Sequence, residues 1–185
     1  MAVRHGGPPK RLTKTASTER ESASLPLARR EQPPGIFDHP YARSVVGYSG
    51  TPLVRKLGIK PDDTVWLKSA PPDVDIERLL HPLPPGAQCI RRVSTRPPEI
   101  VLSFSKHRRE FHTRLAKALN VIDPTGVTWV IWPKKSSELF KAGRQDLTED
   151  VIREHALSLG LVDVKVCAVN ETWSGLKLVY RRANR

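Results

Sequence analysis

Cysteine is scarce in this sequence, and long apolar stretches are missing. The 185 residues include two cysteines, Cys89 and Cys167, which lie far apart in the chain. So few thiols exclude a disulfide framework and a cysteine-based zinc site. No stretch approaches the ~18 consecutive apolar residues of a membrane-spanning helix, and the N-terminus lacks the apolar segment of a secretory signal. We therefore expect a cytoplasmic protein that makes no contact with a membrane.

Sequence motifs of the common enzyme classes are also missing. The chain has no P-loop, no GxSxG nucleophile motif, no HExxH zinc motif and no paired-carboxylate motif. Its six histidines are scattered, and none has the spacing of a metal site. The sequence therefore nominates no catalytic residue, no metal site and no cofactor, and it favours a binding protein over an enzyme.

Positive charge and proline are what the sequence has in excess. It carries 31 Lys and Arg against 19 Asp and Glu, which gives a formal net charge of +12 and a pI of about 10.2. It also contains 17 prolines. Such a charge balance favours anionic partners, among them nucleic acid.

The first 45 residues differ in composition from the rest. They hold six prolines and eight Lys and Arg against four Asp and Glu, with little aliphatic side chain to bury. Such a segment cannot offset its ordering entropy, so we expect residues 1–45 to be a disordered, proline-rich, basic leader. It is either a solvated leader, which includes the case of a start codon placed too early, or a basic arm that scans nucleic acid. Residues 46–185 are long enough for one domain with a single core.

The periodicity of residues 46–185 predicts helices alternating with strands. The clearest helix follows Ser105, which we expect to cap it, because Phe111, Leu115, Ala118 and Leu119 form one apolar stripe. The expected elements are, in order, a helix over 51–58, a strand over 64–67, a helix from Asp73 or Asp75, strands over 87–93 and 99–104, a helix over 106–119, a strand over 127–132, a helix from Asp146 or Thr148 to 159, and strands over 162–169 and 176–182.

This order predicts a three-layer α/β domain with a mostly parallel sheet, helices on both faces and a C-terminal antiparallel hairpin. In that hairpin, Val164, Val166, Leu176 and Leu178 are the expected core positions, and Cys167 is expected to be a buried, inert thiol. A hairpin that ends such a sheet resembles the fold of S-adenosylmethionine-dependent methyltransferases. The resemblance is to a shortened version, which lacks one strand–helix unit between Val93 and Glu99.

The cofactor site that this fold implies is degenerate in the sequence. The turn after the first strand should be rich in glycine, but residues 69–72 read Ser-Ala-Pro-Pro, and proline has no amide donor. The second strand should end in an acidic residue, but it ends near Arg91 and Arg92. We therefore expect no binding of S-adenosylmethionine.

Several motifs also resemble a family of uncharacterised bacterial proteins, the domain of unknown function 3052. They are found at 47–53, 56–59, 132–135, 147–150, 160–167 and 173–177, and the resemblance spans about residues 46–182. It implies a small bacterial cytoplasmic protein, and it supplies no established catalytic residues.

One candidate ligand site is the end of the strand over 127–132. Trp132, Lys134 and Lys135 stand where such a fold binds ligands, and two lysines can hold a phosphate or a carboxylate. Trp173 and Ser174 lie in the expected hairpin turn and complete this candidate anion site. The alternative is that Trp132 packs beneath the loop, that Trp173 covers an apolar edge, and that both lysines are solvated.

A second candidate surface is basic and suits nucleic acid. Its residues come from the helix over 106–119 and from the end of the second strand: Lys106, Arg108, Arg109, Arg114, Arg91 and Arg92. A charged helix face that is only solvated is the alternative. The leading hypothesis is thus a non-catalytic domain that acts through a protein partner or a small anionic ligand. A nucleic-acid-binding accessory protein and an enzyme with an atypical cofactor site are its rivals.

Overall fold

A computed structural model describes residues 50–93 and 95–184 of the chain. These residues all belong to one unit, residues 37–185. The expected disordered leader, residues 1–45, lies outside the described residues. No helix of the described part is long and apolar enough to cross a membrane.

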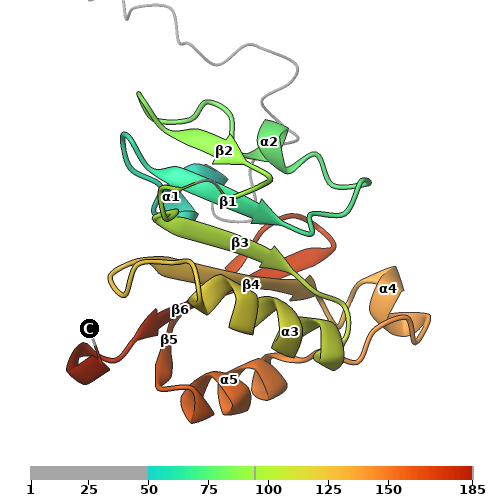
Figure 1. Cartoon of the computed structure of the whole chain (residues 1–185). Helices are drawn as coiled ribbons and strands as arrows, with labels where there is room; N and C mark the ends of the chain where they lie inside the picture. Colours follow the sequence, from blue (N-terminus) through green and yellow to red (C-terminus); the bar gives the residue numbers. More distant parts are fainter. Residues whose placement is uncertain (1–49, 94, 185) are drawn as a thin grey trace, which may run out of the picture. The chain divides into compact units, whose positions relative to one another are not determined.

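Six strands form one sheet in the order β2-β1-β3-β4-β6-β5 (Figure 1). The strands are β1 (Thr64–Lys68), β2 (Gln88–Ile90), β3 (Ile100–Phe104), β4 (Val127–Pro133), β5 (Leu161–Ala168) and β6 (Trp173–Tyr180). The first four are parallel to one another, whereas β6 runs antiparallel to both β4 and β5. The predicted mostly parallel sheet with a C-terminal antiparallel hairpin is confirmed.

Helices cover both faces of this sheet, which makes the three predicted layers. The helices are α1 (Leu53–Leu57), α2 (Ile76–Leu79), α3 (Arg108–Leu119), α4 (Glu138–Lys141) and α5 (Glu149–Ser158). The apolar side chains of α1 and α2 pack on one face, here called the α1 face, and those of α3 and α5 pack on the other, the α3 face (Figure 1). No helix or strand lies between β2 and β3 in the described residues, which agrees with the predicted loss of one strand–helix unit.

Two side chains from the sheet bind the last carbonyl groups of the short helix α1. The indole Nε1 of the fully buried Trp129 donates a hydrogen bond of 3.1 Å to the carbonyl oxygen of Leu57. The Nζ of Lys165 on β5 lies 3.2 Å from the carbonyl oxygen of Lys56. Gly58 then ends the helix in the left-handed conformation, with φ of 77°, as its sequence position predicted.

Helix α3 begins later than the sequence predicted, and with a different cap. Ser105 is not its N-cap residue; His107 occupies that position and makes no side-chain cap. The Oδ1 of Asp146 instead accepts a hydrogen bond of 2.8 Å from the backbone N–H of Arg108. A residue 38 positions away in the sequence thus supplies what a local cap normally gives, so the helix start could not be read from neighbouring residues.

The C-terminal hairpin is tighter than predicted. The sequence analysis placed Trp173 and Ser174 in its turn, and the same pattern predicts that the next residue, Gly175, also lies in the turn with a positive φ. All three lie inside β6, and Gly175 is not among the glycines with positive φ. A Cβ at Gly175 would lie 3.2 Å from Cε3 of Trp129, so this glycine makes room for a core indole rather than for a turn.

Two of the four predicted core positions of the hairpin were wrong. Leu176 and Leu178 are buried, whereas Val164 and Val166 are 58% and 42% exposed. The pairing register shifts between Asp163 and Lys165, which leaves Val164 as the extra residue of a bulge. β5 is also the edge strand, and Val166 lies outside the apolar cluster beneath α5. Strict alternation cannot anticipate a bulge or an uncovered edge.

Candidate functional site

A basic cavity lies at the carboxyl end of β1, against α3. This carboxyl-edge cavity measures about 330 Å³ and is lined by Lys68, Ser69, Arg109, Glu110, Thr113, Arg114 and Lys117. Alternation along β1 directs Lys68 to the same face as Trp66, and its Nζ lies 4.5 Å from the indole ring. Arg109, Thr113 and Lys117 follow one another at four-residue spacing, which places them on one side of α3.

Positive charge is crowded in the carboxyl-edge cavity. Burial lowers the pKa of Lys68, and the nearby charges of Lys117 and Arg114 lower it further. Arg114 is fixed in place, because its Nη1 donates to the carbonyl oxygen of Phe104 at 2.6 Å and to Oε2 of Glu110 at 2.8 Å. Glu110 is the one carboxylate among the described residues that line the cavity, and Arg114 already uses it.

The turn after β1 and the end of β2 have the residues from which we predicted that S-adenosylmethionine does not bind. Ser69 adopts a left-handed φ of 55°, which a glycine would adopt without strain. Pro71 and Pro72 follow and offer no amide donors. Beyond β2, Arg91 takes the place of a ribose-binding acid, and its Nη2 lies 3.1 Å from Oε1 of Glu77.

The structure brings together most of the anion site that we predicted at the end of β4. Lys134, Lys135, Trp132 and Ser174 line one cavity of about 340 Å³, here called the Trp132 cavity. Trp173 does not take part, because it is 1% exposed and packs on the α1 face, edge-on to Phe104.

Acidic side chains balance the lysines of the Trp132 cavity. Glu149, Asp150 and Arg153 also line it. Arg153 pairs with Glu149 at 2.6 Å and with Asp163 at 3.0 Å. The Trp132 cavity is therefore of mixed charge and less suited to an anion than the carboxyl-edge cavity.

The predicted nucleic-acid residues take part in different contacts. Arg109 and Arg114 share the carboxyl-edge cavity. Lys106 turns toward the α1 face, with its Nζ 6.0 Å from the ring of Trp173. Arg91 is paired with Glu77 beyond β2. The structure gives no contact that brings Arg108 or Arg92 to either place.

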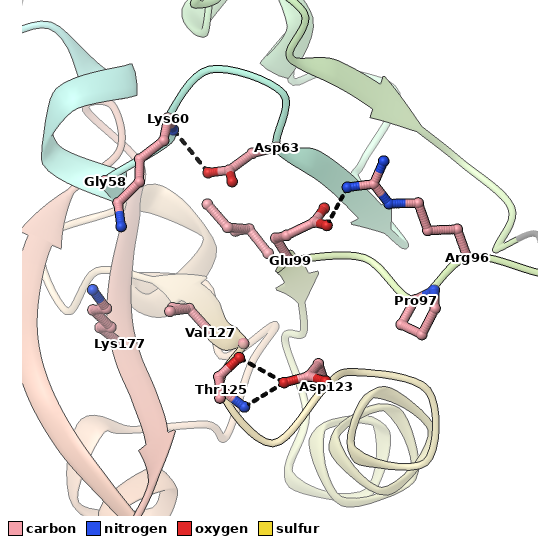
Figure 2. A pocket seen from close by; sticks show the side chains of 12 residues that line it. Gly58, Lys60, Asp63, Arg96, Pro97, Glu99, Asp123, Thr125, Val127 and Lys177 are labelled. Atoms are coloured by element: carbon pink, nitrogen blue, oxygen red, sulfur yellow. Dashed lines mark hydrogen bonds and ion pairs between the residues drawn. The ribbon is translucent and has the colours of Figure 1, made fainter. Parts of the chain in front are cut away.

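A third cavity, larger than these two, lies at the opposite edge of the sheet, and the sequence analysis did not anticipate it. This amino-edge cavity measures about 460 Å³ and surrounds the amino ends of β1, β3 and β4 (Figure 2). Its lining residues are Gly58, Lys60, Asp63, Arg96, Pro97, Glu99, Ile100, Asp123, Thr125, Gly126, Val127 and Lys177. The alternation of β6 could have directed Lys177 to the α1 face, but no sequence signal joins it to Lys60.

Histidine and cysteine add no metal site in the part of the chain that the structure describes. The rings of His112 and His155 stack with centroids 3.8 Å apart between α3 and α5. Burial lowers the pKa of His155, and His112 lowers it further. Cys167 is buried, as predicted, and burial raises the pKa of its thiol; that the thiol is inert stays a prediction.

Comparison with solved structures finds a SAM-dependent methyltransferase and proteins in complex with SAM or SAH, all at low similarity. A SAM-dependent methyltransferase from Aquifex aeolicus is 10% identical, with a TM-score of 0.47, over 76% of this chain and 93% of that one. The DhpI–SAH complex is 11% identical, with a TM-score of 0.47, over 70% and 81%. LepI in complex with SAM is 12% identical, with a TM-score of 0.43, over 70% of this chain, which spans 39% of LepI. These similarities concern the fold alone.

No protein-family model matches the chain, and no curated protein matches it significantly. The resemblance of its motifs to the domain of unknown function 3052 therefore has no support from the family models.

Proposed function

We propose that this α/β domain binds a small phosphate-bearing ligand in the carboxyl-edge cavity, without catalysing a reaction. The observation that carries the proposal is the meeting of Lys68, Arg114 and Lys117 around one cavity. Ammonium and guanidinium groups bind phosphate through charge-assisted hydrogen bonds. Open α/β sheets bind their ligands at the carboxyl ends of the parallel strands, which is where this cavity lies.

The charge balance of the cavity supports an anionic occupant. Arg109 and Lys117 form no ion pair within the described residues, and Glu110 is paired with Arg114. A bound phosphate would supply the missing negative charge and would raise the lowered pKa of Lys68, because an opposite charge favours the protonated amine.

The aromatic side chains favour a discrete ligand over a single-stranded nucleic acid. Proteins that bind single strands stack bases on exposed aromatic rings. No Trp, Tyr or Phe is exposed in the described residues, and Trp66 beside the cavity is 9% exposed. A protein partner, and membership of the domain of unknown function 3052, stay predictions from the sequence.

Calorimetry with sodium pyrophosphate at constant ionic strength tests the proposal. We expect saturable binding by the full chain, weakened about tenfold in Lys68→Gln and in Lys117→Gln, since each removes one charge-assisted contact. The matched control Arg78→Gln removes an exposed charge from α2 and should leave the affinity unchanged. S-adenosylmethionine at the same concentrations should give no heat of binding.

Three outcomes would contradict the proposal. One is pyrophosphate binding that the two cavity variants leave unchanged. Another is micromolar binding of S-adenosylmethionine, which corresponds to about −8 kcal/mol. The third is that a duplex DNA oligonucleotide binds more tightly than pyrophosphate and that this binding weakens steeply with salt. That result would favour the nucleic-acid alternative.

A further inference from the structure

The amino-edge cavity is independent of the proposed phosphate site. It surrounds the amino ends of β1, β3 and β4, whereas ligands of open α/β sheets bind at the carboxyl ends. Its volume of about 460 Å³ exceeds the 330 Å³ of the carboxyl-edge cavity, and Ile100 and Val127 give it apolar surface. The amino-edge cavity is therefore not the usual ligand site of an open α/β sheet.

Two lysine amines meet on one side of this cavity. Lys60 comes from the loop between α1 and β1 and Lys177 from β6, and Figure 2 shows their side-chain nitrogens turned toward each other beside Gly58. The backbone N–H of Lys60 donates to Oδ2 of Asp63 at 2.7 Å, but neither amine has a hydrogen-bond or ion-pair partner within the described residues. Burial lowers the pKa of Lys177, and the charges of Lys165 and Lys60 lower it further.

The carboxylates of the cavity are held by other groups. Oε2 of Glu99 accepts a hydrogen bond of 2.7 Å from the backbone N–H of Thr64, and its Oε1 accepts one of 2.7 Å from Arg96. Oδ1 of Asp123 accepts from the backbone N–H and the hydroxyl of Thr125. Figure 2 shows Glu99 and Asp123 away from the two amines. Asp63 also lines the cavity, and its Oδ2 accepts the hydrogen bond from the backbone N–H of Lys60, but none of these three carboxylates forms an ion pair with either amine within the described residues.

Gly58 lies beside the amine of Lys177. Gly58 has a φ of 77°, and a Cβ built there would lie 4.0 Å from Nζ of Lys177. A side chain at this position would be strained, and it would stand against the amine. Gly58 therefore lies next to the amine of Lys177, at a position where the backbone favours glycine.

We propose that Lys60 and Lys177 bind a small oxyanion, the phosphate or carboxylate group of a ligand whose apolar part rests on Ile100 and Val127. An oxyanion between the two amines receives charge-assisted hydrogen bonds from both. Lys165 adds long-range attraction, while its own amine stays bonded to the carbonyl oxygen of Lys56.

Titration of the 15N-labelled full chain, followed by amide NMR, tests this proposal. The probes are sodium phosphate and sodium acetate, each with sodium chloride at the same ionic strength as reference. We expect saturable shifts of the amides of Gly58 and Gly126, which line the cavity, with phosphate, acetate or both. The dissociation constant should rise about tenfold in Lys60→Gln and in Lys177→Gln, since each removes one charge-assisted hydrogen bond.

Two control variants separate this site from others. Lys141→Gln removes an exposed lysine of α4, which follows the carboxyl end of β4, and should leave the titration unchanged. Lys117→Gln alters the carboxyl-edge cavity and should also leave the shifts of Gly58 and Gly126 unchanged.

The proposal is wrong if neither anion shifts these amides more than chloride does, or if Lys60→Gln binds as tightly as the native chain. Lys60 is exposed, so this variant remains informative even where Lys177→Gln fails to fold.

Discussion

Val166 and Leu176 offer a sharp test of how β5 sits at the edge of the sheet. They stand opposite each other in the β5–β6 pair and therefore on the same face, yet Val166 is 42% exposed and Leu176 is fully buried. Aspartate at each position should therefore have very different effects. We expect Val166→Asp to lower the free energy of unfolding by about 1–2 kcal/mol, and Leu176→Asp by more than about 4 kcal/mol.

The two magnitudes follow from burial. Full burial of a valine or leucine side chain contributes about 1.5–3 kcal/mol, so a valine that keeps 42% of its surface exposed contributes about 1 kcal/mol. The lower strand propensity of aspartate adds at most about 1 kcal/mol at Val166. At Leu176 the whole burial term is lost, and an unpaired carboxylate in the core adds a further penalty of several kcal/mol.

Urea unfolding of the full chain, followed by tryptophan fluorescence, measures both changes, because Trp129, Trp132 and Trp173 are buried beside these strands. Leu176→Ala is the control for lost side-chain volume and should cost about 2–5 kcal/mol without a buried charge. Equal destabilisation by aspartate at Val166 and Leu176 would mean that the side chain of Val166 is covered by other residues, as that of Leu176 is. A Leu176→Asp variant as stable as the native chain would refute the placement of β6 within the sheet.

Two further predictions concern the ring pair and the anchor of α1. Because the folded state lowers the pKa of His155, it disfavours the charged ring, so the free energy of unfolding should fall as the pH drops below about 6.5, the ordinary pKa of histidine. The urea midpoint of His155→Gln should depend less on pH between 7.5 and 5.5 than that of the native chain. The control His81→Gln changes an exposed histidine and should keep the native pH dependence. An unchanged pH dependence in His155→Gln would mean that the ring stacked on His112 does not contribute to the pH dependence of stability. Trp129→Phe leaves the carbonyl oxygen of Leu57 without its indole donor, and its urea unfolding should show a loss of at least about 1–3 kcal/mol. A loss below about 0.5 kcal/mol would mean that this hydrogen bond does not hold α1 in place.

Local signals in the sequence were enough for most of the elements. The apolar stripe of Phe111, Leu115 and Ala118 marked α3, and these three side chains are buried on it. Thr148 was one of two expected caps of α5 and is its N-cap. The alternation of helices and strands, closed by a short hairpin, was enough for the sheet class, because such connections admit few topologies. The short helix α4 was missed, since four residues carry no readable period.

The candidate sites depended on contacts that the sequence could not supply. Trp132, Lys134 and Lys135 are close in the chain and share a cavity, as predicted, because one strand end places them together. Lys68 and Lys117 lie on different elements, and only the packing of α3 against β1 brings them to one cavity.

The sequence by itself determined the class of sheet, the degenerate turn after β1 and the excess of positive charge, because these follow from local patterns and from composition. Only the tertiary structure decided where that charge gathers. Lys60 and Lys177 are distant in the sequence and meet because β6 inserts beside β4 and brings Lys177 to the edge where α1 ends. The bulge at Val164 and the uncovered edge at Val166 likewise depend on strand pairing. Whether a side chain is buried depends on which residues pack over it. For an edge strand, the local sequence pattern does not predict those residues.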